Sequence, residues 1–592
     1  MTSDELFRLD DQPATAADWR DAVDSVLKGA SFEKVLVGRT RGGLDIEPLY
    51  EPGPAVALLP ADPHRVAYGW DIRQRHDASD PAVCAARVLD DLEHGVTSIE
   101  LGPPTASWTL VTLRDALEGV LLDIAPVALA PHADLDAAKA LVALLDESGN
   151  ATTSRSWLGL DPIGAFARNG SVAAVAACAA FAASIAESHP QLVACTVDTT
   201  RYVDAGAHEV QELGWMLATG VATLRALVDA GLTVERAAAT IGFRIAADAD
   251  QFLTIARLRA ARTAWSAVLT ASGAPDAVSP FHAVTAASMF SQRDPAVNML
   301  RSTTAAFAAG VGGADAVTVL PHDSSDSALA RRNARNIQHL LIDECGINRL
   351  VDPAAGSGFV ESLTQRLLQA GWTAFQEVEA AGGMVAVLES GAVADAAKAS
   401  WENRLGGLAT RREPVTGVSE FPDTGPAASA IGGGGQGAFP LRRPAAPFEA
   451  LRDAADRSRS VGVDPIVHLA ALGAQAEHTA RSTWITNLLA VGGLTVVGGD
   501  GDGAASPIEA AARFEATGAS VAVVCSSDAV YAERATATVT ALKDAGATFV
   551  ALAGNPGDRR ADLEAAGVDA FLHVGIDVLR ALGDLHARLG LG

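Results

Sequence analysis

The chain alternates short β-rich runs with helix-length segments, and this alternation constrains its fold more than any other feature. Eight consecutive strand–helix units are what a closed (β/α)8 barrel requires. An open doubly wound sheet is the alternative, and the unbroken series favours closure. The predicted fold class is α/β, with a TIM barrel over residues 61–410. The eight runs are Ser98–Leu101, Val127–Leu129, Trp157–Leu160, Leu192–Val197, Thr240–Ile245, Val278–His282, Ala316–Leu320 and Arg349–Val351.

Three further segments complete the predicted organisation. Residues 1–60 precede the barrel as an N-terminal arm with one helical pattern, Ala16–Leu27. Residues 411–447 are rich in Pro and Gly, including Gly432–Gly435, which favours an irregular linker. Residues 448–592 alternate again and predict a flavodoxin-like, Rossmann-type domain. Its five predicted strands are Ile466–Leu469, Leu494–Val497, Val521–Cys525, Thr548–Leu552 and Ala570–His573.

Composition excludes several classes of function. The 592 residues include 45 Lys and Arg against 71 Asp and Glu, and a net charge of −26 argues against a nucleic-acid partner. The most apolar long stretch, Val172–Ala186, is shorter than the roughly 20 residues that span a bilayer, so no membrane contact is expected. The five cysteines form no CxxC pair, and the N-terminus lacks the pattern of an export signal. We therefore expect a cytoplasmic protein without disulfides or a zinc cluster.

Several motifs, in one order, resemble the methylmalonyl-CoA mutases. That resemblance implies an arm, a barrel and a cobalamin-binding-like domain in this sequence. It also implies an assembled enzyme of propionate metabolism, which interconverts methylmalonyl-CoA and succinyl-CoA by a radical rearrangement on adenosylcobalamin. The motifs run through most of the chain: Trp19, Leu27–Gly29, Phe32-Glu33, Pro48–Tyr50, Trp70–Gln74, Ala256–Arg262, Asp352–Gly358, Gln376–Glu379 and Gly382–Met384.

The family's cobalt-binding motif is missing from its expected place. Catalytic members carry Asp-x-His-x-x-Gly after the first strand of the C-terminal domain, and its neutral imidazole, oriented by a carboxylate, ligates cobalt. Aligned on Gly473, the positions of the family's lysine, aspartate and histidine are taken by Ala471, Gln475 and Glu477. His478 lies one position further on. A shift of one residue turns a side chain away, so we interpret His478 as a solvent-side histidine near a helix start.

The family's catalytic pair in the barrel is replaced as well. Catalytic members carry Tyr-His-Met-Gln-Glu-Ala-Gly-Ala, and the tyrosine and histidine face the substrate. Counting back from Ala205–Ala207 places Thr200 at the tyrosine and Arg201 at the histidine. Arginine cannot exchange a proton near neutral pH. We expect Arg201 to form a local polar cluster with Tyr202 at the barrel mouth instead.

Both replacements remove the same chemistry, and they match the small, or beta, subunit of the heterodimeric mutases. On this interpretation the chain has no catalytic residue, no cobalamin and no metal of its own. It stabilises a large, or alpha, subunit that carries adenosylcobalamin and the acyl-CoA substrate, and its arm, residues 1–60, wraps around that partner. The alternative is a self-sufficient cobalamin-dependent acyl-CoA mutase that uses His478 as a displaced cobalt ligand.

Other motifs suggest ligands that we consider weaker candidates. Asp352–Gly358 resembles the S-adenosylmethionine loop of a methyltransferase, but it follows the eighth predicted strand and not the first strand of an open sheet. Gly498–Gly503 resembles a calcium loop without its twelfth-position acid, so we interpret it as a flexible turn. His282, at the end of the sixth predicted strand, and His322, after the seventh, lie on the face where barrels place chemistry. We interpret both as histidines satisfied by the backbone.

Overall fold

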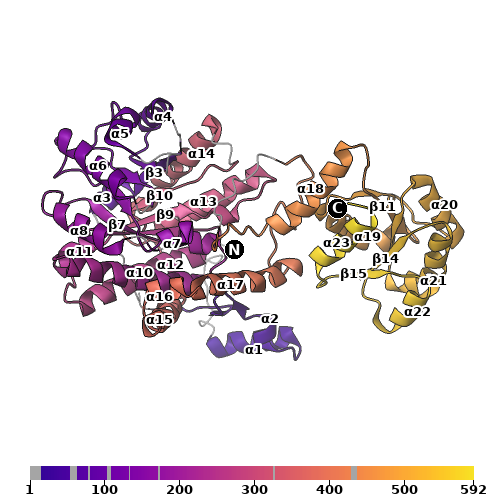
Figure 1. The fold of residues 1–592 in the computed structure, drawn as a ribbon. Coiled ribbons are helices and arrows are strands. Elements are labelled where there is room, and N and C mark those ends of the chain that lie inside the picture. Colours follow the sequence, from indigo (N-terminus) through magenta and orange to yellow (C-terminus); the bar gives the residue numbers. More distant parts are fainter. Residues whose placement is uncertain are drawn as a thin grey trace, which may run out of the picture.

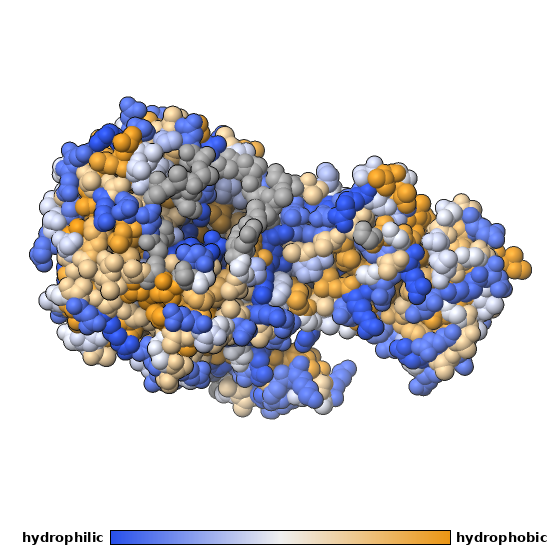
Figure 2. Space-filling model, in the orientation of Figure 1, coloured by the Kyte–Doolittle hydropathy of each residue, from blue (hydrophilic) through white to orange (hydrophobic). Residues whose placement is uncertain are grey.

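The chain folds into two lobes, which helix α18 (Ala446–Ser460) connects (Figure 1). The larger lobe is built around a barrel and the smaller one around an open sheet. On the face seen in Figure 2, hydrophobic residues form separate patches between hydrophilic ones. This computed structural model describes residues 15–53, 63–77, 80–102, 108–131, 134–170, 172, 174–323, 327–427 and 437–591.

Eight parallel strands close the barrel, which confirms the predicted α/β class and the TIM barrel. They pair in the order β10-β3-β4-β5-β6-β7-β8-β9, and β10 also pairs with β3 to complete the ring. Opposite strands, such as β4 and β8, therefore face each other across the interior. The strands are β3 (Asp71–His76), β4 (Ser98–Leu101), β5 (Val127–Leu129), β6 (Trp157–Leu160), β7 (Val193–Asp198), β8 (Ile241–Ala247), β9 (Phe281–Thr285) and β10 (Ala316–Thr318).

The structure corrects one member of the predicted strand series and adds a barrel strand that the series does not contain. Arg349–Val351 forms no strand, and Leu350 is 64% exposed. The strand that completes the barrel is β3, at its beginning. Its Arg73 and His76 are buried. Because these polar side chains point into the barrel or its surrounding layer, β3 lacks the apolar pattern that revealed the other strands.

Helices surround the barrel, and side-chain caps fix where several of them begin. Asp80 accepts a hydrogen bond from Ala82 N, 2.9 Å away, and Pro81 occupies the first turn of α4. On α6, Leu141 and Leu145 are fully buried, and each contributes roughly 1.5–3 kcal/mol. The long helices are α4 (Pro81–Glu93), α6 (Leu135–Glu147), α8 (Val175–Ile185), α10 (Glu209–Asp229), α12 (Gln251–Ala271), α13 (Pro295–Val311), α14 (Ala328–His339), α15 (Gly358–Ala380) and α17 (Ala392–Ala409).

Shorter helices lie in the connections of the larger lobe. They are α3 (Pro63–Tyr68), α5 (Leu110–Ala116), α7 (Ala165–Asn169), α9 (Thr200–Asp204), α11 (Val234–Ala239), η1 (Ala287–Met289), η2 (Leu340–Glu344), η3 (Ile347–Arg349) and α16 (Met384–Glu389). None of the helices in the described ranges is both long and apolar enough to cross a membrane.

The smaller lobe is a five-stranded parallel sheet in the order β12-β11-β13-β14-β15, which flavodoxin-like sheets also have. Alternate strand residues face two apolar layers: Val523 packs into one and Val524 into the other. The strands are β11 (Ile466–Ala471), β12 (Thr495–Val497), β13 (Val521–Cys525), β14 (Phe549–Ala553) and β15 (Ala570–Leu572). The helices are α19 (Gln475–Val491), α20 (Pro507–Thr517), α21 (Asp528–Asp544), η4 (Gly557–Arg559), α22 (Arg560–Ala565) and α23 (Val578–Arg588).

The first part of the N-terminal arm is a helix with little support from its own chain. Helix α1 spans the predicted Ala16–Leu27, buries none of its residues, and lies below the barrel lobe in Figure 1. Trp19 meets Phe32 of α2 (Phe32–Val35) edge to face, with ring centroids 6.0 Å apart. Val26 is 77% exposed. Trp19, Val23 and Leu27, which recur every four residues along one face of the helix, are half-buried, whereas the other residues of α1 are exposed.

The second part of the arm lies on the barrel lobe. Its strands β1 (Gly38–Arg39) and β2 (Asp45–Ile46) form an antiparallel hairpin. Arg366 on α15 donates a hydrogen bond to the carbonyl of Asp45, 2.5 Å away. This half of the arm packs against its own chain.

Candidate functional site

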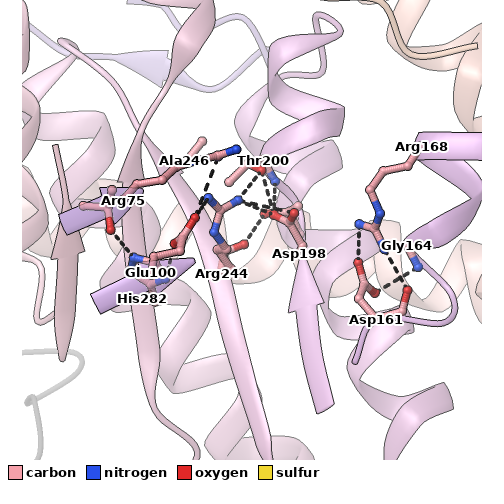
Figure 3. Close-up of polar contacts among 12 residues, drawn as sticks. Arg75, Glu100, Asp161, Gly164, Arg168, Asp198, Thr200, Arg244, Ala246 and His282 are labelled. Atoms are coloured by element: carbon pink, nitrogen blue, oxygen red, sulfur yellow. Dashed lines mark hydrogen bonds and ion pairs between the residues drawn. The ribbon is translucent and has the colours of Figure 1, made fainter. Parts of the chain in front are cut away.

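Charged side chains meet inside the barrel near the carboxyl ends of its strands. Arg244 on β8 donates through Nη2 to Oε1 of Glu100 on β4, 3.2 Å away, and through Nη1 to both carboxylate oxygens of Asp198, each at 3.4 Å (Figure 3). All three residues are buried. Burial disfavours the charge on Asp198, but Arg244 and Arg168 offset it and hold its pKa below the ordinary value. The network therefore keeps its charges inside the barrel.

Aromatic and cationic side chains fill the barrel axis beside this network. The guanidinium of Arg73 on β3 lies 5.0 Å from the ring centroid of Trp157 on β6. Trp157 in turn meets His282 on β9 edge to face, with centroids 6.0 Å apart. All three are buried, and they come from strands spaced around the ring. These three side chains therefore occupy the interior of the barrel at this level.

The structure corrects the interpretation of both barrel histidines. His282 lies in the seventh strand, β9, and its Nε2 is 2.8 Å from the side-chain hydroxyl of Thr318, so its partner is not the backbone. Burial, together with Arg73 and Arg244, holds the pKa of His282 well below its ordinary value. His322 follows the eighth strand, and its buried Nδ1 has no hydrogen-bond partner among the described residues.

A cavity of about 240 Å3 opens at the barrel mouth, above the ion network. Thr200, at the family's tyrosine position, is fixed in its wall: its N and Oγ1 donate to Asp198 Oδ1 at 3.0 and 2.7 Å. Arg244 donates to the Thr200 hydroxyl at 3.0 Å. At this position the wall thus presents a hydroxyl that is already hydrogen-bonded. Charged residues line the cavity: Arg75, Arg168, Arg201, Arg244, Asp198 and Asp204.

Two carboxyl groups at the mouth titrate nearer to neutrality than usual. Burial raises the pKa of Asp161 to about 6, although Arg168 donates to it at 2.8 Å and Gly164 N at 2.9 Å (Figure 3). Burial also raises the pKa of Asp204 to about 6. Asp204 accepts a hydrogen bond from Ser288 N, 2.9 Å away.

Arg201 and Tyr202 do not form the predicted polar cluster. Arg201 lines the cavity, whereas Tyr202 is buried with its ring centroid 5.4 Å from that of Trp215 and 5.3 Å from that of Phe439. The Tyr202 hydroxyl has no partner among the described residues. Successive residues of a helix point about 100° apart, so neighbours on α9 face different surroundings.

A segment of the predicted linker crosses the mouth. We call residues 437–445 the strap; Gly432–Gly435 lie outside the described residues. Phe439 is only 1% exposed, and both it and Leu441 line the cavity. The backbone N of Arg442 donates to the carbonyl of Asp204 at 2.8 Å. The linker is therefore ordered here and forms part of the site.

Ion pairs hold the start of the smaller lobe against the barrel lobe. Arg443 of the strap lies 2.7 Å from Glu449 of α18. Arg293, from the barrel lobe, donates to Asp453 at 2.9 Å and to Asp456 at 2.7 Å on the same helix. The Arg293 side chain is buried, so this contact connects the two lobes firmly.

In the smaller lobe, the residues at the family's cofactor positions have local structural roles. Ala471 ends β11 and is buried. The backbone N of Gln475 donates to Asp502 at 3.1 Å. Glu477 Oε2 accepts from Ala474 N at 2.8 Å and so caps the first turn of α19.

His478 is buried, with 1% of its surface exposed, which corrects the prediction of a solvent-side histidine. It occupies the fourth position of α19, on the face that packs toward the sheet. Its Nε2 lies 3.1 Å from the carbonyl of Gly501, and its Nδ1 lies 2.9 Å from the hydroxyl of Ser482. A carbonyl only accepts, so Nε2 carries the proton and Nδ1 accepts from Ser482. Both ring nitrogens are engaged.

The segment Gly498–Gly503 is not a free turn. Gly503 N donates to Gly473 O at 2.8 Å, and Ala504 N donates to Ala471 O at 2.8 Å, so the segment runs back along the end of β11. A cavity of about 270 Å3 lies beneath it, partly lined by His468. Burial, followed by Arg513, lowers the pKa of His468 to about 4.

The glycine-rich segment Asp352–Gly358 does not follow a barrel strand, which corrects its predicted place. Arg259 pairs with Asp352 and with Glu361 in the interior. A β-carbon on Gly358 would lie 2.1 Å from the carbonyl oxygen of Glu51. At Gly358 the segment therefore packs directly against the arm.

The central residues of the mouth, Glu100 and Arg244, were not singled out from the sequence. Each is a charged residue within an otherwise apolar predicted strand, and that contrast is the signal that could have revealed them. Their pairing could not be seen, because it depends on the closure of the barrel.

Comparisons with known proteins agree in naming one family. A family model described as methylmalonyl-CoA mutase matches residues 109–431. The chain is 44% identical to the methylmalonyl-CoA mutase small subunit of Streptomyces virginiae, over 98% of this chain and 97% of that protein. It is 34% identical to the small subunit of Propionibacterium freudenreichii subsp. shermanii, over 100% and 97%. It is 31% identical to that of Porphyromonas gingivalis, over 98% of both chains.

Proposed function

Because this chain belongs to the methylmalonyl-CoA mutase family, we propose that it is the small subunit of a heterodimeric, adenosylcobalamin-dependent mutase. It stabilises a large subunit that carries the cofactor and the acyl-CoA, and the assembled enzyme interconverts methylmalonyl-CoA and succinyl-CoA. The names of its relatives, each a small subunit matched over nearly its full length, support this assignment. We assign it to the cytoplasm, in keeping with five cysteines that are all free.

The observation that carries the proposal is the state of the cobalt-ligand position. Glu477 stands there, and its carboxylate caps α19. The neighbouring His478 is buried, with both ring nitrogens hydrogen-bonded inside its own lobe. A cobalt ligand needs a ring nitrogen with a free lone pair that faces the cofactor. The residues present do not fit cobalamin, and no chemical step is assigned to it on this chain.

The barrel mouth supports the same conclusion. Thr200 is fixed by Asp198 and Arg244, and Arg201 cannot act as a general acid or base near neutral pH. Deeper in the barrel, Arg73 and Trp157 occupy the axis. The mouth therefore has neither the tyrosine nor the histidine that catalytic members carry at positions 200 and 201, and the axis beneath it is occupied by side chains.

The rival proposal, a self-sufficient mutase with His478 as cobalt ligand, requires a rearrangement. His478 would have to lose its bonds to Gly501 and Ser482 and leave the interior of the lobe. Each lost hydrogen bond would cost about 0.5–1.5 kcal/mol, and an unsatisfied partner would cost more. We favour the small-subunit function on this ground.

The test uses the full chain alone and in complex with a homologous chain that carries Asp-x-His-x-x-Gly. The isolated chain should show neither mutase activity nor cobalamin absorbance, and the complex should show both. Cobalamin bound to the isolated chain in a one-to-one ratio would refute the proposal.

A pair of variants separates the two proposals. His478→Ala in this chain should leave cofactor content and turnover of the complex unchanged. The matched control is the corresponding change of the motif histidine in the large chain, which should abolish both. Loss of cofactor in the His478→Ala complex, with normal assembly, would favour the rival.

A further inference from the structure

The mouth cavity contains one arginine, Arg201, that makes no direct side-chain hydrogen bond or ion pair with the described residues, although Asp198 and Asp204 attract it through space. Arg201 lines this cavity and is half-buried, and its side chain forms no hydrogen bond or ion pair with any residue in the described ranges. A guanidinium presents donors in a planar fork that matches a carboxylate. We propose that the mouth cavity binds a small aliphatic carboxylate, with Arg201 as the residue that holds its charge.

The other arginines of the cavity already have partners. Arg168 binds Asp161 at 2.8 Å, and Arg244 is shared between Glu100 and Asp198. Asp198 and Asp204, each three residues from Arg201, attract it through space without a direct hydrogen bond or ion pair. Asp198 Oδ1 is occupied by Thr200 and Arg244, and Asp204 Oδ1 accepts from Ser288 N. An external carboxylate would therefore supply the direct hydrogen bonds that Arg201 lacks among the described residues.

The walls of the cavity indicate what the anion carries. Val284, Ala286 and Leu320 contribute apolar surface from the barrel side, and Leu441 and Phe439 contribute it from the strap. A volume of about 240 Å3 lies below the usual range for drug-sized ligands, about 300–1,000 Å3, so a ligand of a few carbons fits. A short alkyl chain would lie against these walls while its carboxylate meets Arg201.

The carboxylates of the cavity select against a more highly charged ligand. Asp198 and Asp204 line the same space, and both repel a second negative charge. A dianion such as phosphate would also need more donors than the one unpartnered guanidinium. The site therefore favours a monoanion.

This site is not a remnant of the family's chemistry, because Arg201 stands where the resemblance places a catalytic histidine. The inference goes beyond the proposed function and uses this chain alone. If the chain did not bind a carboxylate, the proposal that it is a mutase small subunit, which is tested by cofactor content and by the need for a large subunit, would be unaffected.

The experiment is a calorimetric titration of the isolated full chain with acetate, propionate and phosphate, in chloride buffer. Propionate should bind at least tenfold more tightly than phosphate. Arg201→Gln should weaken propionate binding at least tenfold. The matched control is Arg412→Gln, which removes an exposed arginine that forms no ion pair in the described chain; it should leave the binding unchanged.

A second variant keeps the test decisive if Arg201→Gln fails to fold. Leu441→Trp retains Arg201 and fills the cavity from the strap, so it should abolish propionate binding without changing the circular dichroism spectrum. Propionate binding that survives Leu441→Trp, a less than tenfold effect of Arg201→Gln in a folded chain, or phosphate binding as tight as propionate binding would each overturn the inference.

Discussion

Arg244 and Glu100 stand on opposite strands of the barrel, and their side chains meet inside it, with Nη2 3.2 Å from Oε1. Both side chains are buried, so neither charge can be solvated by bulk water once its partner is removed. The pair therefore bears directly on the stability of the barrel.

Replacing Arg244 with methionine should destabilise the barrel by about 3–5 kcal/mol, because buried Asp198 would lose its ion pair with Arg244 and buried Glu100 would keep only the more distant Arg75, at 3.7 Å. The unfolding midpoint in urea measures the effect. The control is Arg114→Met, which removes an exposed pair with Glu147 and should cost no more than about 1 kcal/mol. Equal effects of the two changes would contradict this assignment.

The stability of the smaller lobe should fall as the pH drops from about 6.5 to about 4. The pKa of His468 is lowered to about 4 in the folded chain, while the unfolded chain keeps a value near 6.5. Below about pH 6.5, His468 binds a proton in the unfolded state but stays neutral in the folded state until the pH approaches 4. The free energy of unfolding therefore decreases over this range.

His468→Phe should flatten this pH dependence. The ring lies 5.8 Å from that of Phe514, and its Nδ1 has no hydrogen-bond partner among the described residues, so phenylalanine suits the site. Thermal unfolding between pH 4 and 7 measures the slope. His94→Phe, at an exposed position, serves as control and should retain it. An unchanged slope in His468→Phe would contradict the assignment.

Removal of residues 1–36 should weaken binding of the large subunit at least tenfold and leave the chain folded. Helix α1 buries none of its residues on this chain, whereas the hairpin that follows is attached to the barrel lobe. Burial of a large apolar side chain contributes roughly 1.5–3 kcal/mol, which sets the size of the effect. The dissociation constant of the complex is the measurement.

A single substitution in α1 tests whether this helix itself binds the large subunit. Val26→Asp places a charge on the open face of α1 and should reproduce much of the loss. Val111→Asp, at an exposed valine of α5, is the control and should not weaken the complex. A truncated, folded chain with an unchanged dissociation constant would show that the arm does not hold the partner.

Phe439→Ala should release the strap from the barrel. A buried phenylalanine replaced by alanine costs about 3–5 kcal/mol, and this position anchors a connecting segment. Trypsin should then cleave after Arg442 at least tenfold faster; the bond after Arg443 precedes Pro444 and resists trypsin. Phe421→Ala, at an 80% exposed residue, should leave the cleavage rate unchanged. Resistance of both variants would mean that other contacts hold the strap.

The barrel was predictable because seven of its strands have short apolar runs whose pattern is local. Strand β3 has no such apolar run. Its Arg73 and His76 are residue types that usually lie on the surface, but closure of the barrel buries them. Arg349–Val351 is predicted as a strand from its place in the alternation, but in the structure it pairs with no strand of the described residues. Whether such a segment forms a strand depends on pairing with a neighbouring strand, and the sequence of the segment itself does not show which strand will lie beside it.

The candidate site was predictable only in part. The family motifs placed Thr200 and Arg201 at the mouth, and the structure has them there. Arg201 faces the cavity, whereas Tyr202 packs on Trp215. This difference depends on how α9 is rotated about its axis, and the spacing of residues in the sequence does not determine that rotation. The burial of His478 likewise depends on the face that α19 turns to the sheet.

The strap also sets an order for biosynthesis. The apolar slot that receives Phe439 includes Tyr202, Trp215 and Val387, and all of them precede it in the chain. A ribosome therefore completes the slot before it releases the strap, and it finishes the strap before the strands of the smaller lobe emerge. The smaller lobe of a nascent chain can therefore fold next to a barrel that is already folded. A mutation among the residues that contact Phe439 would consequently disturb the folding of the smaller lobe, even though the sequence of that lobe is unchanged.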